Sequence, residues 1–110
     1  MSTLRHWLTA GSVVVLAAAH VARAAEPASR SVAIEQMRFT PQVLTVRRGE
    51  TIVWTNRDLF PHTVTSDGFD SASIAPGASW TWTANKTGRF GYVCTLHPSM
   101  KATLVVEPSR

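Results

Sequence analysis

Residues 92–100 read Tyr-Val-Cys-Thr-Leu-His-Pro-Ser-Met, and this stretch places a thiol, an imidazole and a thioether close together in a Cys-x2-His-x2-Met pattern. A second histidine, His62, lies 32 residues before Cys94 and directly after Phe60-Pro61. Each of these residues alone is usually a packing or surface residue. Together they offer one metal ion a coherent set of soft and borderline donors.

This donor set favours copper. Two imidazoles and one thiolate with a weak axial methionine are the ligands of blue-copper electron-transfer sites, whereas zinc prefers a fourth hard or thiolate ligand. We regard zinc only as a misloaded ion in overproduced protein. The sequence therefore predicts a site for one copper ion, Cu(I) or Cu(II), with His62, Cys94, His97 and Met100 as its ligands.

The first 24 residues have the layout of a secretory signal peptide. Arg5 and His6 precede an apolar run at residues 7–19, and Ala22-Arg23-Ala24 offers small residues for cleavage. The run is shorter than the about 20 apolar residues that a membrane-spanning helix needs. We expect Sec-type export to the periplasm, cleavage after Ala24 and no membrane insertion of the mature chain.

Net charge gives no reason to expect a nucleic-acid partner. The 110 residues include 11 Lys and Arg against 7 Asp and Glu, a formal charge of +4. Loss of Arg5 and Arg23 with the signal peptide leaves 9 − 7 = +2. The remaining basic residues are scattered, and Arg47-Arg48 is their only adjacent pair after the signal peptide, so no basic patch is indicated.

Cys94 is the only cysteine. A single thiol excludes a disulfide framework, a four-cysteine zinc site, a cysteine-ligated iron–sulfur cluster and a copper pair bridged by two thiolates. An unpaired thiol in an oxidising compartment is open to oxidation and cross-linking. Binding a metal as thiolate would remove that liability.

The rest of the chain has the pattern of an all-β domain without helices. We expect residues 25–31 to be a polar tether and residues 32–108 to form one antiparallel β-sandwich of about seven or eight strands. A hairpin-type turn is expected at residues 85–88 and a loop at residues 66–78. The expected strands are residues 32–34, 43–46, 51–55, 62–65, 80–84, 89–94 and 101–107, and the expected core aromatics are Phe39, Trp54, Trp80, Trp82, Phe90 and Tyr92.

These motifs resemble the cupredoxins, the type 1 blue copper proteins, and among them most of all the amicyanins. The spacing of the Cys-His-Met loop is that of amicyanin, whereas pseudoazurins and plastocyanins have more residues between the second histidine and the methionine. The likeness extends over residues 33–107 and rests on Met37-Arg38-Phe39-x-Pro41, Val46-x-x-Gly49-Glu50-Thr51-x-x-Trp54-x-Asn56, Pro61-His62 and Tyr92-x-Cys94-Thr95-x-His97-Pro98-x-Met100-Lys101.

The resemblance implies a Greek-key sandwich with the copper at one end. His62, Cys94 and His97 would be the strong equatorial ligands, and Met100 would be the long axial one. His97 would be the ligand nearest to solvent, and the surface around it would dock redox partners, such as a dehydrogenase and a c-type cytochrome. We expect a monomer whose docking surface consists of Leu59, Phe60, Leu96, Pro98 and Ser99.

The chain departs from the family at three points. Thr63 follows the upstream histidine, where the family commonly has an asparagine that braces the ligand loops. We expect Pro61 and Thr63, which flank His62, to support the site from outside the ligand set. Leu96 replaces a common proline between Cys94 and His97, and the segment between His62 and Cys94 is shorter than in amicyanin.

Two other functions compete with an electron carrier. A periplasmic copper chaperone or copper-resistance module on the same fold would usually hold Cu(I) with several methionines. Only Met37 and Met100 remain after the expected cleavage, with no methionine-rich tract. A copper oxidase or nitrite reductase needs further domains and histidines. We therefore expect an electron carrier without substrate turnover, with the chaperone as the alternative.

Overall fold

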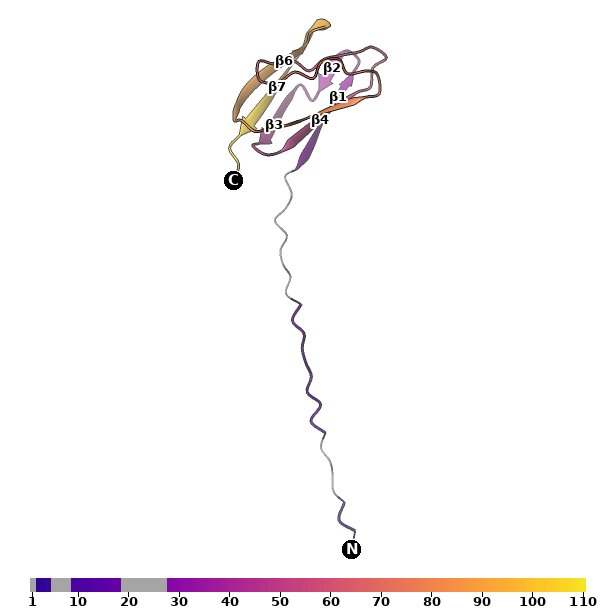
Figure 1. Ribbon diagram of the computed structural model, residues 1–110, viewed down its shortest axis with the longest axis vertical. Coiled ribbons are helices and arrows are strands. Elements are labelled where there is room, and N and C mark those ends of the chain that lie inside the picture. Colours follow the sequence, from indigo (N-terminus) through magenta and orange to yellow (C-terminus); the bar gives the residue numbers. More distant parts are fainter. Residues whose placement is uncertain (1, 5–8, 19–27) are drawn as a thin grey trace.

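The domain is a sandwich of two β-sheets (Figure 1). The computed structural model describes residues 2–4, 9–18 and 28–110, and these contain no helix. One sheet has the strand order β2-β1-β4-β5 and the other has the order β3-β7-β6. This confirms the expected all-β sandwich. Its strands are β1 (Ser29–Glu35), β2 (Arg38–Thr40), β3 (Val43–Arg47), β4 (Thr51–Asn56), β5 (Ser79–Thr83), β6 (Gly88–Cys94) and β7 (His97–Glu107).

Both sheets are mixed, where the sequence had suggested purely antiparallel pairing. β1 runs parallel to β4, and β3 runs parallel to β7. The reason is that the chain crosses from one sheet to the other between β2 and β3, between β3 and β4, and between β5 and β6. Strands that are distant in sequence therefore become neighbours with the same direction.

Residues 84–87 form one of these crossings, so the expectation of a hairpin-type turn at residues 85–88 was wrong. β5 and β6 belong to different sheets. Ala84, which follows β5, bonds to the two residues that precede β4. The Ala84 N–H donates to the Glu50 carbonyl, and the Gly49 N–H donates to the Ala84 carbonyl. Turn residues between two strand-like runs look alike whether or not those runs pair with each other.

The N-terminal part of the domain begins earlier than expected. β1 starts at Ser29, and residues 29–31 pair with β4, although we had assigned them to a polar tether. Much of the expected signal peptide, including the cleavage site at residues 22–24, lies outside the described residues. The described residues include no helix long and apolar enough to cross a membrane.

The core lies between the sheets and follows the alternation of the strands. In β4 the buried positions are Ile52, Trp54 and Asn56, and in β7 every second residue from Met100 to Val106 is buried. Trp54, Tyr92 and Phe39 are buried as expected. The other three expected core aromatics, Trp80, Trp82 and Phe90, are half-buried and pack against the core from its margin.

Phe69 is a core residue that the sequence did not reveal, because it lies in the segment expected to be a loop. It is buried, and its ring centroid lies 4.6 Å from that of Trp82 and 5.9 Å from those of Trp54 and Phe90. Its neighbour Gly68 approaches Phe90 so closely that a Cβ there would lie 2.9 Å from the ring. Phe69 therefore fastens the long connection between β4 and β5 to the sandwich.

Candidate metal centre

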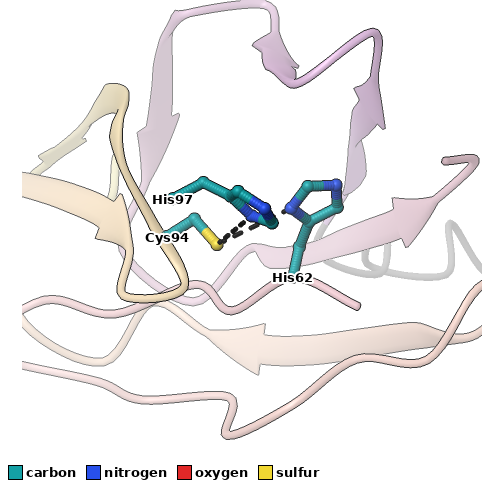
Figure 2. Close-up of side chains that lie close together, drawn as sticks. All are labelled: His62, Cys94 and His97. Carbon is teal, nitrogen blue, oxygen red and sulfur yellow. Dashed lines mark hydrogen bonds between the residues drawn. The ribbon is translucent and has the colours of Figure 1, made fainter. Parts of the chain in front are cut away.

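Three potential ligands converge at one end of the sandwich, as Figure 2 shows for the side chains of His62, Cys94 and His97. One donor atom from each lies within 4.8 Å of the others. Cys94 is the last residue of β6 and His97 the first residue of β7, and the two face each other in the hairpin. His62 comes from the connection between β4 and β5, where it forms an isolated bridge with Ile74.

The spacing of the donor atoms fits a shared ion. Cys94 Sγ lies 3.6 Å from His62 Nδ1 and 3.8 Å from His97 Nδ1. A metal bound to a thiolate at about 2.3 Å and to an imidazole nitrogen at about 2.0–2.1 Å holds those atoms about 3.6–3.8 Å apart, for angles between tetrahedral and trigonal. The two nitrogens and the sulfur are therefore placed as ligands of one ion would be.

Met100 is also buried, three residues after His97 in β7. Its thioether would be the weak fourth donor that distinguishes a blue-copper set from a plain His2Cys set. The four residues thus form the donor pattern of a type 1 site for one copper ion.

The ring of His62 is oriented by Asp58, a residue that the sequence analysis missed. His62 is fully buried, and its Nε2 lies 2.9 Å from Asp58 Oδ2. A carboxylate can only accept, so Nε2 carries the proton and the lone pair of Nδ1 faces Cys94. Histidine ligands commonly donate their second N–H in this way. An acidic residue four positions before the histidine was the only available signal, and it is a weak one.

Asp58 also ties the centre to the turn between β1 and β2. Its two carboxylate oxygens accept the backbone N–H groups of Gln36, at 2.7 Å, and Met37, at 3.0 Å. Both residues have positive φ, 52° and 58°, so the turn conformation needs such support. Burial raises the pKa of Asp58, but the Met37 amide, His62 and the Gln36 amide outweigh burial and hold the pKa below its ordinary value of 3.8.

Asn56 shapes the backbone that leads to His62. It is fully buried, and its Nδ2 donates to the carbonyl oxygens of Phe60, at 2.7 Å, and Ile74, at 3.0 Å. Its Oδ1 accepts the N–H of Asp58 at 3.0 Å. One side chain at the end of β4 therefore fixes both branches of the loop that carries the ligand.

Thr63 links the two loops that carry ligands. Its backbone N–H donates to Cys94 Sγ at 3.3 Å, and its hydroxyl oxygen accepts the backbone N–H of Thr95 at 2.9 Å. The Thr63 side chain thus joins the segment after His62 to the residue after Cys94. Pro61, on the other side of His62, is exposed.

The residues expected to dock partners are all exposed. Leu59 is 88% exposed, Phe60 59% and Leu96 51%, and Pro98 and Ser99 are exposed as well. Leu59 and Phe60 precede His62, whereas the other three flank or follow His97. His97 itself is half-buried, in contrast to the buried His62 and Cys94. It is therefore the histidine of this set with access to solvent.

A two-sheet β-sandwich in which two histidines and one cysteine converge at one end, with a buried methionine three residues after the second histidine, has the features of the blue-copper class. The chain matches the family of cupredoxin-like domains over residues 8–106 and belongs to that family.

Relatives and solved structures agree with this assignment. The chain is 31% identical over 83 residues to the amicyanin of Paracoccus versutus, in an alignment that covers 69% of this chain and 63% of that protein. A solved amicyanin mutant with Cu(I) is similar with a TM-score of 0.67 and 26% identity, over 72% of this chain and 82% of the other. These findings make amicyanin a close relative within the family.

A copper-containing nitrite reductase from Thermus scotoductus SA-01 is also similar, with a TM-score of 0.72 and 26% identity. The match covers 82% of this chain but only 25% of the reductase. This chain therefore corresponds to a single domain-sized part of that enzyme.

Proposed function

We propose that this protein is a periplasmic carrier that passes single electrons between redox proteins, with His62, Cys94, His97 and Met100 as copper ligands. The observation that carries the proposal is the convergence of Cys94 Sγ with Nδ1 of both histidines, at 3.6 and 3.8 Å. Copper bound here would supply a one-electron couple, Cu(II)/Cu(I).

The chain's own role is to keep the donor atoms fixed. His62 is held by Asp58, and the Cys94 sulfur accepts the N–H of Thr63. Cys94 and His97 are joined by the β6–β7 hairpin, with Met100 further along β7. Fixed donors keep geometric change small when the charge of the centre changes, which suits electron transfer.

The sequence offers no further histidine that could hold a second, catalytic copper. Beyond residue 24 the only histidines are His62 and His97, and both are in the proposed ligand set. This supports a carrier without substrate turnover. The layout of the first 24 residues supports export to the periplasm before function.

The exposed loop residues around the half-buried His97 support docking of a redox protein there, such as a dehydrogenase as donor or a c-type cytochrome as acceptor. To test this, cytochrome c is used as the acceptor for the reduced protein. Leu96→Glu should slow the transfer at least about tenfold, because a buried charge in an apolar contact costs more than about 1.4 kcal/mol. Val43→Glu, at a 55% exposed position on a strand without ligands, is the matched control.

The decisive experiment for the centre is the visible spectrum after addition of Cu(II) to the purified protein. An intense blue thiolate-to-copper band, absent in Cys94→Ala and His62→Ala, is expected. Met100→Leu should alter the band, whereas Met37→Leu should leave it unchanged. A colourless protein that binds only Cu(I) would contradict the carrier and favour the chaperone.

A further inference from the structure

A chain of hydroxyl groups leads from the two ligand loops to a carboxylate on the surface. Thr63 Oγ1 lies 3.1 Å from Thr95 Oγ1 and 2.9 Å from Thr65 Oγ1. Thr65 Oγ1 in turn donates to Asp70 Oδ1 at 3.1 Å. Asp70 Oδ1 also accepts the Ala72 N–H at 3.0 Å. Among the described residues, Asp70 has no hydrogen bond to any of the four proposed ligands.

The carboxylate sets the direction of every bond in this chain. Each hydroxyl has one proton to donate, and an ionised carboxylate can only accept. The hydroxyl of Thr65 donates its proton in the hydrogen bond to Asp70, so its oxygen must accept the hydrogen bond from the hydroxyl of Thr63. The hydroxyl of Thr63 then donates to Thr65, so in the bond between Thr63 and Thr95 the hydroxyl of Thr95 must be the donor.

This direction determines what faces the metal centre. The oxygen of Thr63 must accept both the hydroxyl and the backbone N–H of Thr95, and therefore turns its lone pairs toward residue 95. Thr63 also donates its own backbone N–H to Cys94 Sγ at 3.3 Å. An ordered Thr63 side chain thus ties together the residue after His62, the residue after Cys94 and the sulfur itself.

We propose that Asp70 is a positioning residue for the metal centre, acting through the hydroxyls of Thr65 and Thr63 on the N–H bond to the Cys94 sulfur. The proposal rests on the proposed copper site. Hydrogen bonds to a ligand sulfur tune the potential of blue-copper centres. The positive end of an N–H dipole stabilises the more negative, reduced state, so a weaker bond lowers the potential.

The first test uses the copper-free, reduced protein and is independent of metal binding. Asp70→Asn keeps the shape of the side chain but can donate as well as accept, so the direction of the chain is lost. We expect the backbone N–H of Thr95 to exchange with deuterium about tenfold faster, which corresponds to one hydrogen bond of about 1.4 kcal/mol. Asp67→Asn, an exposed carboxylate of the same loop, is the matched control. Unchanged exchange in Asp70→Asn, or equal change in Asp67→Asn, overturns the proposal.

The second test uses the copper-loaded protein. Thr65→Val interrupts the series of hydroxyl hydrogen bonds without changing a charge. A lower reduction potential and a shifted thiolate-to-copper band would therefore be caused by loss of these hydrogen bonds and not by the electric field of Asp70. Thr65→Ser restores the hydroxyl and should restore both values. Asp70→Asn added to Thr65→Val should have no further effect on the band. A Thr65→Val protein that is less stable but has an unchanged band and potential shows a purely structural role and overturns the proposal.

A failure of the copper site itself gives a different result. In that case no blue band forms in any variant, while the exchange experiment on the copper-free protein still reports whether Asp70 orders the chain.

Discussion

Asp58 shows how much of the centre depends on one side chain that is not a ligand. It accepts three donors from two separate parts of the chain: the backbone N–H groups of Gln36 and Met37 and the ring N–H of His62. Because it accepts the hydrogen bond from Nε2–H, it leaves Nδ1 as the only nitrogen of His62 that can bind a metal.

Replacement of Asp58 by Ala should therefore weaken both metal binding and the fold. Loss of the carboxylate leaves a buried N–H of His62 unpaired, which costs about 1–3 kcal/mol of unfolding free energy. Copper affinity should fall about 10–100-fold. Denaturant unfolding of the copper-free protein and a competitive copper titration measure the two effects. Equal affinity in Asp58→Ala and in Asp67→Ala would contradict this role.

Tyr92 makes the protein sensitive to alkali. Burial raises the pKa of Tyr92 to about 12, and the bond from the Trp54 indole N–H, at 3.3 Å, lowers it only in part. The ordinary value is 10.0, so between about pH 10 and 12 the folded state holds a proton that the unfolded chain has lost. The stabilisation is full below pH 10 and declines as the pH rises to 12, by about 2–3 kcal/mol.

This decline is measurable by denaturant unfolding between pH 9 and pH 12, with pH values chosen around the ordinary and raised pKa. Tyr92 is the only tyrosine, so tyrosinate absorbance in the ultraviolet reports it alone. Tyr92→Phe should flatten the pH dependence. Ionisation of Tyr92 near pH 10 in the folded protein would show that the ring is not buried as described.

At the scale of elements, the long connection between β4 and β5 has little regular structure but carries residues that build the proposed centre. It carries Asp58, His62 and Thr63, and it is fixed by side chains more than by strand pairing. Asn56 holds its start and Phe69 inserts into the aromatic core. The ligand position thus depends on packing some seven residues further along the chain.

Phe69→Ala should therefore destabilise the protein by about 3–5 kcal/mol, the usual cost of removing a buried phenylalanine. It should also lower copper affinity, since the connection is released from the core. Phe60→Ala, at a 59% exposed position of the same connection, should cost less than about 1 kcal/mol. Similar unfolding midpoints for the two variants would contradict the anchoring role.

The strands with clear alternation were predictable from the sequence, as were the core residues Trp54 and Tyr92 and the convergence of His62, Cys94 and His97. Sheet membership was not, because a turn such as residues 85–88 has the same composition whether it joins paired strands or crosses between sheets. Phe69 was missed because its partners Trp82 and Phe90 lie far away in sequence, and no local pattern marks such contacts. Asp58 was missed because an acidic residue four positions before a histidine is a weak signal, and its bonds to the β1–β2 turn cannot be seen in the sequence.

At the scale of the whole molecule, the proposed metal centre would add a further link between the two sheets, beside the backbone bridge between Thr65 and Val93 and the bond from the Thr63 N–H to Cys94 Sγ. His62 follows a strand of the four-stranded sheet, whereas Cys94 and His97 belong to the three-stranded one. An ion bound by all three closes one end of the sandwich.

Removal of copper should therefore lower the unfolding temperature. At a free copper concentration 100 times the dissociation constant, bound metal stabilises the folded state by about 2.7 kcal/mol. Thermal unfolding before and after chelation measures the difference, and Cys94→Ala should abolish it. An unfolding temperature that does not respond to copper would mean that the ion does not bind the folded state preferentially.

The strand order of the three-stranded sheet also has a consequence for the order in which the sheet and the site can form during synthesis. β7 lies at its centre, between β3 and β6, so every strand pair of that sheet includes residues 97–107. Nascent chains that have not yet been synthesised past this strand have neither the sheet nor the hairpin that brings His97 to Cys94. The complete donor set therefore exists only after the last strand has been synthesised, and Cys94 is made before His97 and Met100 are available beside it.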